Sequence, residues 1–159
     1  ATHINEVLRE ALPTLLADFD IIHICGKGKI EQSLLDMPGY RQYEYVRAEL
    51  ADLLAAADLI VSRAGANFLF EILALKKPML LIPLPKGSSR GDQILNAESF
   101  QKQGFSMVLA DDALTSSALT EAVAELYSKR KTFIAAMEDY PLRDAVSAVM
   151  QQIKNTAKK

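Results

Sequence analysis

Short apolar runs recur along this chain, and each is followed by a turn and then by a segment with helical periodicity. Continuous apolar runs of this length are typical of strands buried on both faces, as in parallel sheets covered by helices. A parallel strand reaches its neighbour through a crossover, so the alternation predicts right-handed strand-helix-strand units. We therefore expect an α/β fold with a doubly wound parallel sheet, whose strands we place at residues 19–25, 41–46, 59–62, 79–82 and 106–109.

Helical segments are expected between these strands. The first has apolar residues at helical spacing from Ile4 to Leu16, and Pro13 should bend or loosen it. Further helices are expected at residues 30–35, 49–56, 67–75 and 92–103, and the chain after residue 109 should be mostly helical. A chain of 159 residues has the size of one domain, which we assign to residues 1–159.

Composition and charge narrow the functional classes. The net charge of -2 provides no basic surface of the kind that a nucleic-acid-binding protein needs. The single cysteine, Cys25, lies in an apolar run and is expected in the core, which fits a reducing cytoplasm. No apolar stretch approaches the ~20 residues of a membrane span. We therefore expect a cytoplasmic protein with no nucleic-acid partner.

A glycine turn follows the strand at residues 59–62 and opens the helix at residues 67–75. The free N–H groups and the positive dipole end of a helix start attract anions, so Gly65 marks a candidate phosphate site. Glu71 follows it by about one and a half helical turns. A carboxylate at that place would accept hydrogen bonds from both hydroxyls of a ribose. Phosphate and ribose together indicate a nucleotide.

A second polar segment follows the strand at residues 79–82 and a loop rich in Pro, Gly and Ser. Gln93 and Asn96 share one face of the first turn of the next helix, where their amides would bind the hydroxyl groups of a sugar. Alternatively, Asp92 or a nearby serine caps this helix and both amides are solvated. Ligands of doubly wound sheets bind at the carboxyl ends of the strands, so both segments should form one site.

Three segments together resemble a known family. They run from Arg63 to Glu71, from Lys77 to Pro83 and from Asp92 to Ala97. Their residues and spacing are similar to those of the donor-binding domain of MurG-type enzymes, the peptidoglycan N-acetylglucosaminyltransferases of glycosyltransferase family 28. The resemblance implies the carboxyl-terminal, Rossmann-like half of a two-domain GT-B fold. It also implies inverting transfer of N-acetylglucosamine from UDP-N-acetylglucosamine to undecaprenyl-pyrophosphoryl-MurNAc-pentapeptide, which converts lipid I to lipid II.

The resemblance implies roles for the residues around the glycine turn. Gly65, Ala66 and Asn67 would offer the amides of the helix start to the diphosphate, and Glu71 would hold the ribose. Arg63 would act as a structural residue or as a cation beside the phosphates.

The resemblance also implies how the sugar and the base are bound. Gln93 would read the sugar hydroxyls with Asp92 beside it, where many family members have a second glutamine, and Asn96 would support that helix start. The backbone of Val46 and Arg47 would meet the uracil ring.

The same resemblance implies that this domain contains no catalytic residue and no bound metal or cofactor, because the helix-start amides would stabilise the charge on the departing UDP. Asp18 and Asp20 form an Asp-x-Asp sequence, but they precede a strand and should lie at the opposite edge of the sheet. His23, within an apolar run, is expected in the core. His3 should make only local hydrogen bonds. Asp111, with the neighbouring Asp112, should cap the helix that follows.

The implied partners are UDP-N-acetylglucosamine and, through an amino-terminal domain outside this sequence, lipid I and the inner face of the cell membrane. The protein would then be cytoplasmic and peripheral on that membrane. A second hypothesis remains open: the chain is a non-catalytic nucleotide-sugar binding module or the donor subunit of a split glycosyltransferase.

In the family, a central strand and a glycine-rich phosphate loop precede the first helix, whereas this sequence begins at the residue that matches the end of that loop, Ala1. We therefore expect the first central strand to be missing and its two neighbours to have unpaired ladders. Such ladders are costly, so we also expect upstream residues or another chain to pair with them.

Overall fold

The computed structural model describes residues 2–88, 90–139, 150–151 and 153–154. In chain order its elements are α1 (Thr2–Leu15), β1 (Ile21–Ile24), the 3-10 turn η1 (Gln32–Leu34), β2 (Tyr40–Tyr43), α2 (Leu50–Ala56), β3 (Ile60–Ser62), α3 (Ala66–Ala74), β4 (Met79–Leu81), the 3-10 turn η2 (Lys86–Ser88), α4 (Asp92–Lys102), β5 (Ser106–Val108), the 3-10 turn η3 (Asp111–Ala113), α5 (Ser116–Ser128) and α6 (Arg130–Glu138).

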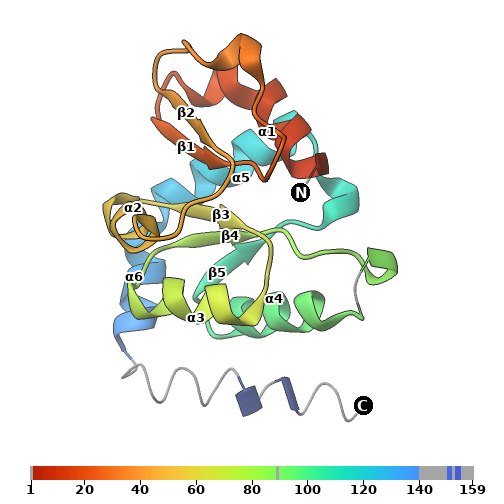
Figure 1. Cartoon of the computed structure of the whole chain (residues 1–159). Helices are drawn as coiled ribbons and strands as arrows, with labels where there is room; N and C mark the ends of the chain where they lie inside the picture. The colour runs from red at the N-terminus through yellow and green to blue at the C-terminus, as the bar shows by residue number, and fades with distance from the viewer. Residues whose placement is uncertain (1, 89, 140–149, 152, 155–159) are drawn as a thin grey trace.

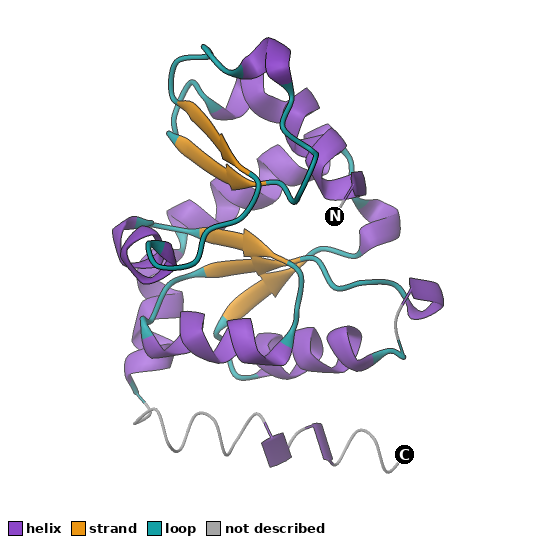
Figure 2. Ribbon diagram, viewed as in Figure 1, coloured by secondary structure: helices purple, strands orange, loops and turns teal. Residues whose placement is uncertain are grey.

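The strands form two parallel sheets. β1 pairs with β2, and β4 lies between β3 and β5 in a three-stranded sheet. The arrowheads of both sheets point to the same side of the molecule, as Figure 2 shows. The expected fold class, an α/β protein with parallel strands joined by helices, is confirmed.

The two sheets are not paired with each other in the described part of the chain. β1 and β3 each have one strand neighbour, and Figure 1 shows the sheets set apart with α1 and α5 alongside both. Ile22, Ile24 and Val61 on these strands are between 40% and 49% exposed, which is unusual for apolar strand residues. Within the described residues, β1 and β3 thus each carry one unpaired ladder, and the missing central strand stays a prediction.

β4 is covered on both faces, as its unbroken apolar run predicts. Met79 and Leu81 pack in a cluster with residues of α3 and α4, such as Ile72. Leu80 packs in a second cluster with residues of α1 and α5, such as Leu119. The three-stranded sheet is therefore doubly wound, and the helix starts on both faces are held by well-packed apolar clusters.

Three buried polar residues, Asn5, His23 and Tyr40, form what we call the His23 network. The Asn5 amide nitrogen donates to the Cys25 carbonyl at 2.8 Å, so its Oδ1 accepts from His23 Nε2 at 2.8 Å. His23 Nδ1 then accepts from the Tyr40 hydroxyl at 2.7 Å. The network fastens α1 to β1 and β2, and it confirms that His23 and Cys25 belong to the core.

Two local predictions are wrong. Residues 30–35 form only the short η1 turn, because Pro38 follows closely and disfavours helical backbone at the residue before it. The strand expected at residues 41–46 ends at Tyr43. Pro13 lies inside the last turn of α1, where it removes the amide that would donate to the Arg9 carbonyl.

Candidate functional site

β3, β4 and β5 end at one edge of the sheet, and helices α3 and α4 begin there (Figure 2). The side-chain nitrogen of Asn96, on α4, donates a hydrogen bond to the Ala64 carbonyl, just before α3, at 2.9 Å. The fold therefore brings the two segments predicted to share a site into direct contact.

Helix α3 begins without a side-chain cap. Gly65 occupies the N-cap position, and within the described part of the chain no side-chain cap hydrogen bond engages the first amides, those of Ala66, Asn67 and Phe68. The φ of Gly65 is -72° and its ψ is 132°, which any residue adopts. A Cβ built on Gly65 would have no atom within 4 Å. The glycine is therefore required neither by the backbone nor by packing, and it leaves open space before a helix start with partial positive charge.

Glu71 lies farther along α3, and its side chain is exposed. Its neighbours Leu69, Ile72 and Leu73 are the residues that α3 buries. Within the described part of the chain, no ion pair engages the Glu71 carboxylate. The carboxylate is therefore free to accept hydrogen bonds from a ligand at this surface.

Gln93 and Asn96 hold the backbone that leads into α3. Gln93 Oε1 accepts from the amides of Ala64 at 3.2 Å and Leu84 at 2.9 Å, and Asn96 binds the Ala64 carbonyl. The peptide groups on both sides of Ala64 are thus fixed by side chains of α4. Neither residue is merely solvated, and Gln93 keeps only its amide nitrogen for a sugar hydroxyl. Asp92 is exposed beside them in the first turn of α4.

Arg63 binds the ends of the neighbouring strands. Its Nη1 lies 2.6 Å from Asp111 Oδ1 and also donates to the carbonyls of Ile82 at 3.2 Å and Pro83 at 3.3 Å. We call the four side chains that join these strand ends the strand-end network: Arg63, Gln93, Asn96 and Asp111. In this arrangement the three contacts of Arg63 Nη1 are all with protein groups.

Sequence reasoning missed Asp111. We expected it to cap the helix that follows, but Thr115 caps α5 by accepting from the Ala118 amide at 3.1 Å. The Asp111 carboxylate instead binds Arg63, and its second oxygen lies 3.4 Å from His3 Nδ1. His3 therefore makes a long-range contact and not only local ones. No local pattern indicates this cluster, because it depends on the order of the strands.

The electrostatics of the strand-end network favour an ionised Asp111. Burial raises the pKa of this carboxyl, but the hydrogen bond and charge of Arg63, with a smaller contribution from His3, outweigh burial and lower the pKa below its usual value. The ion pair with Arg63 is therefore formed at neutral pH.

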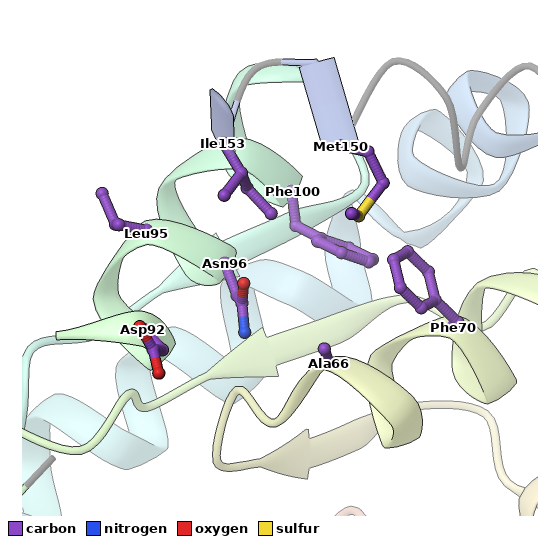
Figure 3. A pocket seen from close by; sticks show the side chains of 8 residues that line it. All are labelled: Ala66, Phe70, Asp92, Leu95, Asn96, Phe100, Met150 and Ile153. Atoms are coloured by element: carbon purple, nitrogen blue, oxygen red, sulfur yellow. The ribbon is translucent and has the colours of Figure 1, made fainter. Parts of the chain in front are cut away.

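A pocket with a volume of about 300 Å³ lies between α3 and α4 (Figure 3). At the helix starts it is bordered by three of the expected site residues, Ala66, Asp92 and Asn96. The rest of its lining is apolar: Phe70 of α3, Leu95 and Phe100 of α4, and Met150 and Ile153 near the carboxyl end of the sequence. The candidate site therefore has a polar mouth at the sheet edge and an apolar wall behind it.

Val46 and Arg47 lie in the loop after β2, beyond the end of that strand. The Arg47 guanidinium carbon is 5.3 Å from the centre of the Tyr45 ring, in cation-π range, and the Arg47 carbonyl accepts from the Leu50 amide at 3.3 Å. Of the expected site residues, these two are the only pair on the two-stranded half of the molecule.

Among the described residues, no group of three or more His, Cys, Asp or Glu side chains is arranged to hold a metal ion. In the same part of the chain, no helix combines the length and apolar character needed to cross a membrane.

The sequence matches the family model "Glycosyltransferase family 28 C-terminal domain" over residues 1–153. It is 52% identical over 155 residues to the UDP-N-acetylglucosamine--N-acetylmuramyl-(pentapeptide) pyrophosphoryl-undecaprenol N-acetylglucosamine transferase of Geobacillus thermodenitrificans (strain NG80-2), covering 98% of this chain and 44% of the relative. It is 48% identical over 158 residues to the enzyme of the same name from Lachnospira eligens, covering 99% of this chain and 45% of that relative. The chain thus spans less than half the length of these relatives.

Solved structures show the same fold. MurG of Acinetobacter baumannii superposes with a TM-score of 0.70 at 24% identity, over 99% of this chain and 46% of that one. The glycotransferase of kitacinnamycin superposes with a TM-score of 0.73 at 22% identity, over 97% of this chain and 38% of that one. Together with the family match and the relatives about half identical, these findings establish that the chain belongs to the glycosyltransferase family 28 C-terminal domain family.

Proposed function

We propose that this chain is the donor-binding domain of an inverting N-acetylglucosaminyltransferase that uses UDP-N-acetylglucosamine as donor and lipid I as acceptor. The observation that carries the proposal is the uncapped, open start of α3 at Gly65, with the exposed Glu71 on the same helix. A helix start of this kind attracts phosphate, and a nearby carboxylate binds ribose hydroxyls. The names of the relatives support N-acetylglucosamine as the transferred sugar.

In this proposal the residues around the start of α3 bind the nucleotide part of the donor. The amides of Ala66 and Asn67 face the diphosphate, and Glu71 accepts from the ribose. As the bond to the sugar breaks, negative charge grows on the departing UDP, and the amides stabilise it without a divalent cation. The base that deprotonates the acceptor hydroxyl comes from outside this domain.

The remaining donor contacts come from two further loops. Gln93 directs its free amide nitrogen at a sugar hydroxyl while its oxygen holds the Ala64 and Leu84 amides, with Asp92 beside it. The backbone of Val46 and Arg47 meets the uracil ring. Lipid I and the inner face of the membrane are contacted by another domain, which makes the enzyme cytoplasmic and peripheral on the membrane.

Calorimetric titration of the 159-residue chain with UDP-N-acetylglucosamine tests the proposal. We expect Glu71→Ala to raise the Kd by about tenfold or more, because the ribose hydroxyls lose a charged acceptor. Glu98→Ala removes an exposed carboxylate from α4 and serves as the matched control, with an unchanged Kd. Wild-type protein that binds no UDP compound, or a Glu71→Ala variant that binds as well as the control, would refute the proposal.

Titration with UDP-glucose and UDP alone separates the sugar contacts from the nucleotide contacts. We expect UDP-N-acetylglucosamine to bind most tightly and Gln93→Ala to reduce this preference. Equal affinity for all three compounds would remove Gln93 from sugar recognition while leaving the nucleotide site in place. Addition of EDTA should leave each affinity unchanged.

A further inference from the structure

Asp111 follows β5 and lies across the sheet edge from the turn that opens α3. Its bond to Arg63 is short, 2.6 Å, and the side chains of the pair are only 18% and 19% exposed. Water screens such a half-buried pair less than a surface pair, so the carboxylate restricts the orientation of the guanidinium.

Arg63 depends on this carboxylate for its position. Its Nη1 makes the contacts with Asp111, Ile82 and Pro83, while its Nε is buried without a partner in the described part of the chain. The carbonyls of Ile82 and Pro83 are neutral acceptors at longer distances. The Asp111 carboxylate is therefore the strongest group that fixes the guanidinium.

The position of Arg63 is transmitted to the donor site through the backbone. Arg63 directly precedes Ala64, whose amide and carbonyl are held by Gln93 and Asn96, and Gly65 follows. The Pro83 carbonyl that Arg63 binds is adjacent to the Leu84 amide that Gln93 binds. A shift of the guanidinium therefore moves both the start of α3 and the amide of Gln93.

We propose that Asp111 is a positioning residue of the donor site: through Arg63 it holds the ends of β3 and β4 where the α3 amides meet the donor diphosphate. This inference rests on the proposed function, because it names what the strand-end network positions. Asp111 itself touches no donor atom, so its removal lowers affinity only while Arg63 is present.

The test is a double-mutant cycle in donor affinity, measured on folded protein well below its unfolding temperature. We expect Asp111→Ala to raise the Kd for UDP-N-acetylglucosamine by about tenfold, since a half-buried guanidinium loses its charged partner. Arg63→Ala should have a similar effect, and the double variant should bind no more weakly than Arg63→Ala alone. Asp111→Glu, which restores a carboxylate, should recover part of the affinity.

Asp112→Ala is the matched control, because it removes an exposed carboxylate from the adjacent position and should leave the Kd unchanged. A Kd for Asp111→Ala equal to that of the control, or effects of Asp111→Ala and Arg63→Ala that add in full, would overturn the inference. Different results would refute the proposed function itself: no donor binding by the wild-type chain, or no effect of Glu71→Ala on the Kd. Donor binding that depends on Glu71 but not on Asp111 refutes the positioning role alone.

Discussion

The His23 network and the strand-end network both join separate elements through polar side chains, yet they differ in what they leave unsatisfied. In the His23 network each donor has an acceptor, and the histidine is buried. In the strand-end network the side chains bind backbone groups at the ends of β3 and β4, while the adjacent amides that open α3 have no side-chain cap among the described residues.

This difference indicates that the His23 network stabilises the fold, whereas the strand-end network borders a binding site. Amides without a protein acceptor are tolerated only where water or a ligand reaches them. The open start of α3 is therefore a place where a ligand can bind to the backbone. The His23 network, in contrast, satisfies its groups internally and offers none to a ligand. We therefore expect changes in the first network to affect folding, and changes around the second to affect donor affinity.

The largest expected effect is that of His23→Ala. It leaves the Asn5 and Tyr40 polar groups buried without their partner and opens a cavity, so the free energy of unfolding should fall by about 3 kcal/mol. Urea denaturation followed by circular dichroism measures this change, and the Kd of the folded fraction for UDP-N-acetylglucosamine should stay constant. His3→Ala, at an exposed position, is the control. An equal loss in both variants would remove the distinction between the two networks.

Gly65→Ala should weaken donor binding and leave the stability of the fold unchanged, which is the reverse of the result expected for His23→Ala. The backbone at this position suits any residue and the added methyl group meets no protein atom, so unfolding should be unchanged. The methyl group enters the space before the α3 amides, and the Kd for UDP should rise by about tenfold, or about 1.4 kcal/mol. Gly87→Ala is matched to it, because a Cβ there also has no atom within 4 Å. Unaltered UDP binding by Gly65→Ala would place the diphosphate elsewhere.

The sequence was informative where the physical cause is local. The apolar run of β4 predicts a strand covered on both faces, and a glycine between a strand and a helix predicts an open helix start, since neither depends on distant residues. The predicted end of β2 at Val46 was wrong, because a strand ends where its pairing with the neighbouring strand ends, and β2 pairs with β1 only as far as Tyr43. Asp111 was missed because its partner Arg63 lies on another strand end, and the order of β3, β4 and β5 is not written in any local pattern.

A smaller effect is expected for Tyr40→Phe. This change keeps the ring in the core but removes the hydroxyl that donates to His23 Nδ1, so a buried acceptor loses its donor and unfolding should become easier by about 1 kcal/mol. Tyr43→Phe, on the same strand but exposed, is the matched control and should show no change. Denaturant titration of the two variants decides the matter, and equal midpoints would show that the hydroxyl contributes nothing.

The smallest effect near neutrality is that of pH on the His23 network. Burial, followed by the positive charge of Arg9, lowers the pKa of His23 from 6.5 to about 4. Between these pH values the His23 ring is protonated in the unfolded chain but neutral in the native one. The free energy of unfolding is therefore highest above pH 6.5 and falls as the pH decreases toward 4. Unfolding measured between pH 6.5 and 5.5, above the range in which carboxylates titrate, should show this slope in the wild-type chain. His23→Gln should flatten it, because the variant has no ring to protonate, and an equal slope in both proteins would assign the acid sensitivity to another group.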